Sequence, residues 1–335
     1  MMDYDKLWYK KLKLQAKTDY KMFTKIDKLF FQKNADRLAL VWHSLHIKLV
    51  IKDGKIEIVK DDSFLDSHNR IPRAKQFIEK TLEYIKKNNY KSIDGEFIMS
   101  IGDSFDIDPK IPIISYSKPK NVKGFLFPDF HMNLLEEKKE LFEEKCSDIE
   151  KINKIYFKGN STSKNNTKIR EKLSPLSDDI LNISLDKTDF KPFYDICRYK
   201  YVLDIPGNRP WSVRLIELYL SKSLPLRINF YSSEKKNNKF YKYDQWIQFY
   251  ELMFPENESY INFAYNNYYL QEISNNKIQQ IKKDLINKYK YFEKNPELYY
   301  KIVNENFEKT KYFTMNHIYY YIYKMFKYYN KLIKK

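Results

Sequence analysis

The chain contains little glycine, proline or cysteine for its length. Of its 335 residues, 6 are glycine, 12 are proline and 2 are cysteine. Cys146 and Cys197 are too few for a disulfide framework or for a four-cysteine zinc site, so we expect a reducing, cytosolic setting. The sequence shows no internal repeat, heptad run or long low-complexity tract, which argues against a solenoid, a coiled coil and a disordered polymer.

Long apolar runs are also missing. The first thirty residues carry a charge every two or three positions, so they lack the apolar segment of a secretory signal peptide. No stretch approaches the ~18 uncharged apolar residues that a membrane-spanning helix needs. We therefore predict a cytoplasmic protein without a membrane span; a peripheral contact with a membrane surface is compatible with this expectation.

Positive charge is abundant, with 61 Lys and Arg against 44 Asp and Glu and a formal net charge of +17. Such a balance is typical of proteins that bind nucleic acid or an anionic membrane surface. It is also what AT-rich codons, which favour Lys, Asn, Tyr, Ile and Phe, would produce in a protein with an anionic substrate. Acidic residues occur throughout the chain and no nucleic-acid-binding motif is recognisable. A basic nucleic-acid-binding protein therefore remains the alternative hypothesis.

The first half of the chain alternates between helix and strand patterns. Residues 1–35 have a helical, basic pattern, and residues 38–60 a strand pattern with a hairpin turn at Asp53-Gly54. Apolar residues at helical spacing predict an amphipathic helix over 72–88. Short buried strands are expected at 96–101 and 111–116, and a charged helix over 133–150 marks a boundary between two halves.

The second half repeats this alternation, which predicts parallel α/β layers. Its expected strands are 153–157, 199–205 and 224–230, and its expected helices lie near 168–173 and over 212–222. From residue 276 the pattern is helical to the C-terminus. The Tyr and Phe stripes of these last helices favour core packing over a base-stacking platform.

The most informative segment runs from residue 199 to residue 227. A buried strand ends at Gly207, a tight loop follows, and a helix begins near Ser212. The N-terminus of a helix exposes unpaired N–H groups, which favour phosphate. Ser212 can cap this helix or donate to a phosphate oxygen, and Arg214 can bind the same anion through its guanidinium or lie on the surface. Arg209 is a further candidate in this loop.

A second candidate phosphate loop follows the expected strand 153–157. It contains a glycine turn and three consecutive hydroxyl groups, which suit pyrophosphate oxygens; an Asn- and Ser-rich surface turn is the alternative. Arg170 can reach the same anion if the loop folds back. The candidate residues are Tyr156, Lys158, Gly159, Ser161, Thr162, Ser163 and Arg170.

A single aspartate is the candidate for acid–base chemistry. Asp103 comes just after a buried strand and after Gly102, so its side chain can project into a cleft. An ordinary Asp is ionised at neutral pH and can accept a proton from an attacking hydroxyl, although a turn or cap role is equally compatible with its position. Asp106 and Asp108 form a D-x-D that could hold a divalent metal through oxygen ligands.

Together these segments resemble glycosyltransferase family 90, which includes capsule-associated and lipopolysaccharide-modifying transferases and protein O-glucosyltransferases. The resemblance runs in order over about residues 68–270. It rests on the strand, loop and Ser-x-Arg of 199–226, on the loop 156–163, and on the Asp103 turn followed by 112–118 and Phe127-Pro128-Asp129-Phe130. The first 65 residues show no match.

The resemblance implies an α/β architecture of the GT-B type, in which two Rossmann-like domains face a central cleft and helices follow at the C-terminus. Residues 1–148 would form the acceptor-side domain with the catalytic base. Residues 149–310 would bind the nucleotide sugar. Residues 311–335 would form a last helix, expected to pack back on the first domain.

The resemblance also implies an inverting, metal-independent transferase that uses a UDP-sugar, with glucose or xylose favoured, and no further cofactor. Asp103 matches the base, Arg214 the diphosphate-binding arginine, and Ser161, Thr162 and Ser163 the nucleotide-sugar loop. Phe127, Pro128, Asp129 and Arg70 would line the acceptor cleft. Ser161 stands where relatives often have Arg, so Arg170 would take over that role. A glycan, lipid or protein would accept the sugar; a catalytically inactive scaffold is the remaining alternative.

Overall fold

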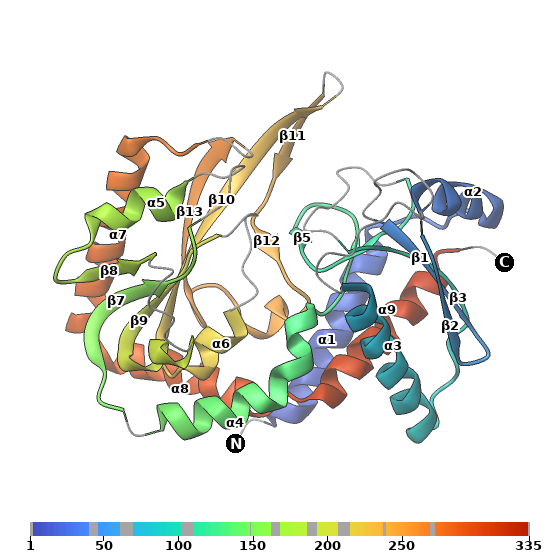
Figure 1. The fold of residues 1–335 in the computed structure, drawn as a ribbon, viewed down its shortest axis with the longest axis horizontal. Coiled ribbons are helices and arrows are strands. Elements are labelled where there is room, and N and C mark those ends of the chain that lie inside the picture. The colour runs from blue at the N-terminus through green and yellow to red at the C-terminus, as the bar shows by residue number, and fades with distance from the viewer. Residues whose placement is uncertain are drawn as a thin grey trace. The chain divides into compact units, whose positions relative to one another are not determined.

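The computed structural model describes residues 3–39, 46–60, 70–101, 110–147, 149–161, 168–185, 193–206, 215–236, 239–268 and 272–333. It is a mixed α/β protein that divides into two compact units (Figure 1). The first unit comprises Met1–Leu135, Ile247–Met253 and Phe313–Lys335, and the second comprises Glu136–Trp246 and Phe254–Tyr312. The first division therefore falls at 135/136, not at 148/149 as the sequence suggested, because the charged helix joins the second unit.

The first unit contains a mixed five-stranded sheet of order β2-β1-β3-β4-β6. Its described elements are α1 (Tyr4–Lys21), α2 (Lys28–Ala39), β1 (His46–Lys52), β2 (Lys55–Val59), α3 (Arg70–Lys87), β3 (Gly95–Ser100), β4 (Ile114–Ser115), β5 (Lys118–Pro119), β6 (Phe125–Leu126), η1 (Phe130–Leu134), η4 (Glu251–Met253) and α9 (Met315–Asn330). Strands β3, β4 and β6 are parallel, whereas β1 is antiparallel to both β2 and β3. The parallel, Rossmann-like layer expected here is thus limited to three strands.

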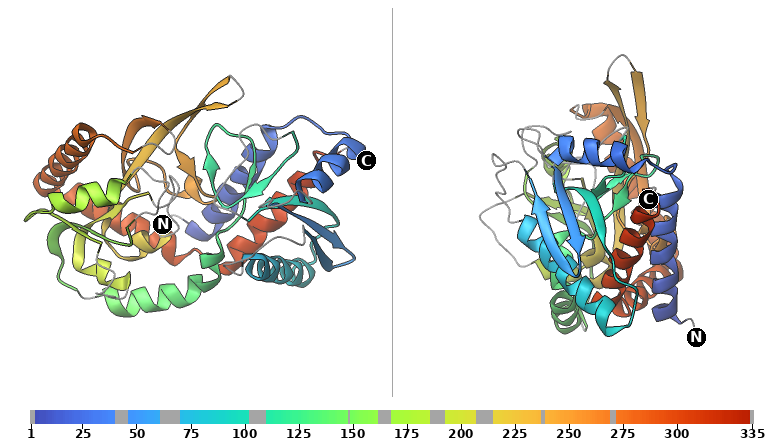
Figure 2. Two further views of the ribbon diagram at one scale, coloured as in Figure 1. Left: turned by 45° about the horizontal axis from the view of Figure 1, so that its top comes forward. Right: turned by 90° about the vertical axis from the view of Figure 1, so that its right-hand side faces the viewer.

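Helices α1 and α9 lie side by side in this unit, as the right-hand view of Figure 2 shows. Aromatic residues contribute to the contact: the ring of Trp8 stacks on Phe313, just before α9, with centroids 4.0 Å apart, and Tyr9 meets Tyr320 edge-on at 4.8 Å. The tyrosine stripe of the C-terminal helix is therefore largely core packing, as its periodicity indicated. Among the helices that the structure describes, none has the length and apolarity to cross a membrane.

The second unit is built on five parallel strands in the order β8-β7-β9-β10-β13. Its described elements are α4 (Leu135–Cys146), β7 (Ile152–Lys158), α5 (Ile169–Leu173), η2 (Ser174–Leu176), β8 (Leu181–Ser184), η3 (Phe193–Arg198), β9 (Tyr199–Asp204), α6 (Leu215–Leu220), β10 (Leu224–Lys236), β11 (Lys239–Tyr243), β12 (Trp246–Ile247), β13 (Ile261–Tyr268), α7 (Asn275–Lys294) and α8 (Pro296–Lys311). Numbered along the chain, the order is 2-1-3-4-5, that of a doubly wound sheet.

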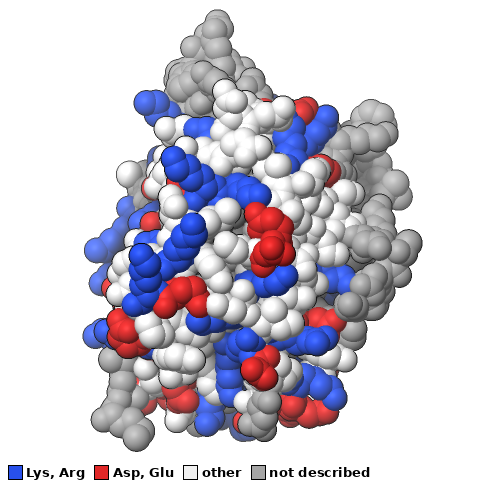
Figure 3. Space-filling view, turned by 90° about the vertical axis from the view of Figure 1, so that its left-hand side faces the viewer, with Lys and Arg blue, Asp and Glu red and all other residues white. Residues whose placement is uncertain are grey.

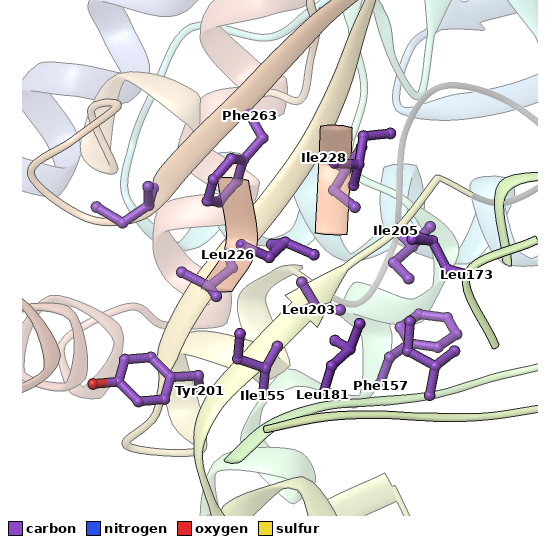
Figure 4. Close-up of a cluster of buried hydrophobic side chains, with 14 of the residues drawn as sticks. Ile155, Phe157, Leu173, Leu181, Tyr201, Leu203, Ile205, Leu226, Ile228 and Phe263 are labelled. Carbon is purple, nitrogen blue, oxygen red and sulfur yellow. The ribbon is translucent and has the colours of Figure 1, made fainter. Parts of the chain in front are cut away.

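Alternate residues of these strands form the core of the second unit (Figure 4). Phe157, Leu203 and Ile228, for example, are at most 1% exposed. They pack with apolar residues of α5, α7 and α8, whereas α6 contacts β9 and β10 through Leu215, Leu218 and other buried side chains. A parallel sheet needs cover on both faces, and this cover leaves its carboxyl edge as the place where a ligand can reach the backbone.

Cys146 and Cys197 form a disulfide in the second unit, with Cα atoms 5.4 Å apart. Both cysteines are buried. The bond joins the end of α4 to η3, the segment that precedes β9. Disulfides persist in oxidising compartments and are rare in the cytosol, so this bond does not favour the reducing setting expected from the sequence, and the cytoplasmic location stays a prediction.

Candidate functional site

Strands β7 and β9 are neighbours in the sheet and define its switch point. The chain leaves β7 for β8 on one side and then enters β9 on the other side of β7. In doubly wound sheets the crevice outside the carboxyl ends of two such strands is the usual ligand site. Residues 159–161 follow β7 and residues 205–206 follow β9. Both candidate phosphate loops therefore begin at this edge of the sheet.

Arg170 ties the beginnings of these two loops together. Its Nη1 donates to the carbonyl oxygen of Asn160 at 3.0 Å and its Nη2 to that of Ile205 at 2.8 Å. The guanidinium also lies over the ring of Phe157, 5.0 Å from its centroid. The side chain is buried, at 6% exposure. This geometry gives Arg170 a role in positioning the loops, beside the anion-binding role that the sequence suggested.

The helix that carries Arg170 is held to the segment before α7. Glu272 forms ion pairs with Lys168 at 2.9 Å and with Lys172 at 2.8 Å, and the ammonium of Lys172 also donates to the carbonyl of Ile273 at 2.6 Å. Hydrogen bonds from Lys172 and Lys168 lower the pKa of Glu272 to about 2. These contacts hold α5 near the carboxyl ends of the strands.

A buried ion pair lies at the end of β9, next to the second loop. Arg227 Nε is 3.4 Å from Asp204 Oδ2, and both side chains are at most 3% exposed. Arg227 also donates from Nη2 to the carbonyl of Trp246 at 3.2 Å and lies over the ring of Tyr260. Sequence analysis missed this pair, although a charged residue inside each of two apolar strands was the available signal.

The remaining described residues of the first loop have different environments. Tyr156 lies inside β7, where its ring is buried and stacks on Tyr199 with centroids 3.8 Å apart, so its described contact is core packing. Lys158 ends β7, the N–H of Gly159 donates to the carbonyl of Ser184 at 3.2 Å, and Ser161 is exposed. The other candidates of this unit, Thr162, Ser163, Gly207, Arg209, Ser212 and Arg214, lie outside the described residues.

In the first unit, Arg70 holds the strand end that leads to Asp103. Its Nη1 donates to the carbonyl of Ile101 at 2.8 Å, and Ile101 is the last described residue before 102–109. Asp103 itself, with Asp106 and Asp108, lies outside the described residues. Arg70 therefore has a described contact with the backbone beside the candidate base.

The Phe127-Pro128-Asp129 segment follows β6 and is firmly packed. The N–H of Phe127 donates to the carbonyl of Ser115 at 2.8 Å, and the buried ring of Phe127 meets Phe77 edge-on. The carboxylate of Asp129 accepts from the N–H of His131 at 2.9 Å and caps η1. Like Ile101, this segment leaves the carboxyl end of a parallel strand in the first unit.

A second buried ion pair supports that segment, and sequence analysis missed it as well. Lys118 Nζ is 3.2 Å from Asp19 Oδ1, and Asp19 Oδ2 accepts from the N–H of Leu126 at 3.3 Å. Gln15 donates to the same carboxylate, and Lys118 donates to the carbonyl of Val122 at 2.9 Å. Burial raises the pKa of Asp19, and Lys118 opposes that rise. The pair fixes α1 to the backbone that precedes Phe127.

Charges of both signs occur together on one face of the molecule (Figure 3). On the face shown in Figure 3, Lys and Arg side chains lie among Asp and Glu side chains and do not form one continuous basic area. Ion pairs of this kind include Lys282 with Asp178 at 2.7 Å and Lys200 with Glu293 at 2.6 Å. Within the described part of the chain, no group of three or more His, Cys, Asp or Glu side chains is arranged to hold a metal ion.

Comparison with known proteins adds no further assignment: no model of a protein family matches the chain, and no curated protein matches it.

Proposed function

We propose that this chain is an inverting glycosyltransferase of the GT-B type, which moves a sugar from a UDP-sugar to a hydroxyl group of a glycan, lipid or protein. The main support is the switch point of the second unit: both candidate phosphate loops start at the ends of the two strands that flank it. The arginine bridge between those loop starts adds to this support.

The reaction would be a single displacement. Asp103 accepts the proton of the acceptor hydroxyl, whose oxygen forms a bond to the anomeric carbon of the sugar. The bond from that carbon to the diphosphate oxygen breaks, and the diphosphate leaves with the electron pair. Attack from the face opposite to the leaving group inverts the anomeric configuration. General-base assistance of this kind contributes ~10²–10⁴-fold in rate.

The leaving diphosphate gains negative charge, and in this proposal the protein itself supplies the compensating positive charge. Arg214, backbone N–H groups and the hydroxyls of Ser161, Thr162 and Ser163 would bind the phosphate oxygens. One preorganised donor of this type is worth ~10²–10³-fold in rate. No metal is required in this scheme. Loss of transfer in excess EDTA, with rescue by manganese, would instead assign Asp106 and Asp108 to metal binding.

In this scheme the described residues hold backbone groups of the site in place. Arg170 holds the carbonyls of Asn160 and Ile205 at the mouths of the two loops. Arg70 holds the carbonyl of Ile101 near the proposed base. Rigid placement of this kind turns binding energy into a reactive geometry.

A donor-hydrolysis screen tests the proposal, because many transferases slowly pass the sugar to water. UDP-glucose, UDP-xylose and UDP-galactose are the first donors. Asp103→Asn should keep UDP affinity and lose ~10²–10⁴-fold in turnover, whereas Asp108→Asn in the same segment serves as the matched control. Near-normal turnover of Asp103→Asn would remove the base from the mechanism.

Two other experimental outcomes would favour the alternative functions over a transferase. UDP binding without turnover of any donor or acceptor indicates an inactive scaffold. A salt-dependent shift of an oligonucleotide, with no thermal stabilisation by UDP, indicates a nucleic-acid-binding protein.

A further inference from the structure

The first unit has a cavity of about 910 Å³ that the proposed transferase does not use. Its walls are the segment before and at the start of α2, residues 91–96, and the end of α9. It lies at the amino end of β3, whereas the candidate base follows the carboxyl end of the same strand. Strand β3 extends over roughly 20 Å between the cavity and Ile101, the last described residue before the candidate base.

Lysines dominate the charge of this cavity. Its two carboxylates already have partners: Asp94 Oδ1 accepts from the N–H of Asp53 at 2.9 Å, and Glu96 Oε2 lies 3.6 Å from Lys48 Nζ. The lining lysines are Lys25, Lys28, Lys91, Lys327 and Lys331.

These five lysines, which we call the cavity lysines, outnumber the two carboxylates that line the same cavity. None of them forms an ion pair with a described Asp or Glu, and the ammonium groups of Lys327 and Lys331 lie over the rings of Tyr323 and Tyr328. The neighbouring Lys324 shows the effect of this positive charge. Burial is the main cause that lowers its pKa, and the charges of Lys327, Lys13 and Lys331 lower it further. An anion in the cavity would relieve this repulsion.

Part of the cavity lining is apolar. The side chains of Phe31, Ile93 and Tyr323 line it and are buried. Asn330 donates to the carbonyl of Asp94 at 2.9 Å. A Cβ on Gly95 would lie 2.4 Å from Asn330 Oδ1, so a larger residue there would displace the Asn330 side chain.

We propose that this cavity binds a phosphate-bearing ligand with an apolar portion. Several ammonium groups in one lining suit a multiply charged phosphate, and the apolar lining residues suit the carbon skeleton that carries it. The volume is within the range of small-molecule sites. The ligand is either a soluble phosphate ester or the headgroup of a phospholipid, since both present the same chemistry to the lysines.

The test uses the full chain with saturating UDP, which occupies the proposed donor site. The probes are inorganic pyrophosphate, dihexanoyl phosphatidic acid below its micelle concentration, and phosphatidylcholine vesicles with and without 20 mol% phosphatidic acid (about one lipid in five). Calorimetry and vesicle sedimentation measure binding. A preference for the soluble probes or for the acidic vesicles tells which source carries the phosphate.

The decisive variant replaces Lys28, Lys91 and Lys327 by glutamine. It should bind each effective probe about 100-fold more weakly, because each lysine near a phosphate surface contributes about fivefold. The control replaces Lys283, Lys290 and Lys301, exposed lysines of the second unit, and should change binding less than twofold despite the same loss of charge.

The same experiment distinguishes a loss of ligand binding at the cavity from a loss of folding or of donor binding. The cavity variant should melt at or above the wild-type temperature in low salt, since it loses like-charge repulsion, and it should keep wild-type affinity for UDP. Equal weakening in both triple variants, or no binding of any probe to the wild type, overturns the proposal.

Discussion

Replacing Arg170 by alanine should both destabilise the second unit and weaken UDP binding. The guanidinium makes two charge-assisted hydrogen bonds, to Asn160 O and Ile205 O, and contacts the ring of Phe157. Hydrogen bonds to charged groups are each worth about 1.5–3 kcal/mol. Because Arg170 is only 6% exposed, solvent cannot replace these bonds fully. We expect a loss of about 4 kcal/mol in the free energy of unfolding.

Urea titration followed by circular dichroism measures the stability, and calorimetry with UDP measures the coupling to the loops. Arg170→Lys should recover part of the loss only, since one ammonium cannot span two carbonyls as a planar guanidinium does. Arg198→Ala is the matched control: Arg198 is exposed in the same unit, and its loss should stay within about 0.5 kcal/mol. The reasoning fails if Arg170→Ala loses less than about 1 kcal/mol and keeps its UDP affinity.

Three further predictions concern the base, the disulfide and a half-buried lysine. Asp103→Asn should lower donor turnover ~10²–10⁴-fold while calorimetry finds unchanged UDP affinity; a parallel loss of both would show a structural role. Replacing Cys146 and Cys197 by serine should cost up to about 4 kcal/mol in urea unfolding, since the bond closes a loop of about 50 residues; a variant as stable as the oxidised wild type would contradict this. Burial lowers the pKa of Lys151 to about 7, so the unfolded chain binds an extra proton between pH 7 and about 10.5 and stability should rise with pH there. Lys151→Met should flatten that rise, and an unchanged slope would contradict the assignment.

The elements that the sequence predicted well are those with strong local signals. The Asp53-Gly54 turn is confirmed: both residues have positive φ, 49° and 74°, as a tight hairpin turn requires. The apolar run that ends at Asp204 forms β9, and the amphipathic pattern at 72–88 forms α3 over Arg70–Lys87. Local periodicity was sufficient for each of these.

Other elements were missed or displaced because their signals are weak or shared. Leu38 belongs to α2, not to a strand as expected, because an apolar residue at a helix end resembles one at a strand start. The expected strand 111–116 is reduced to Ile114–Ser115. Strand β8 has only four residues, and β13 contains three asparagines among its apolar residues. Neither gave a clear strand pattern in the sequence. Without these two strands the order of the sheet could not be derived.

The contacts around the candidate site depend on tertiary structure that local patterns do not encode. Arg170 was singled out from the sequence, but its described acceptors are backbone carbonyls 10 and 35 residues away. The pairing of Asp204 with Arg227 and the meeting of the two cysteines likewise depend on strand order. Sequence identified which residues to consider, and the fold supplied their partners.

Hydrogen exchange with and without UDP tests the central claim most directly, because it reports backbone protection along the whole chain. The account predicts that UDP slows exchange in residues 158–163 and 205–215, the two loops at the switch point, and that Arg214→Ala abolishes both effects. Protection confined to other segments, or no protection at saturating UDP, would contradict it.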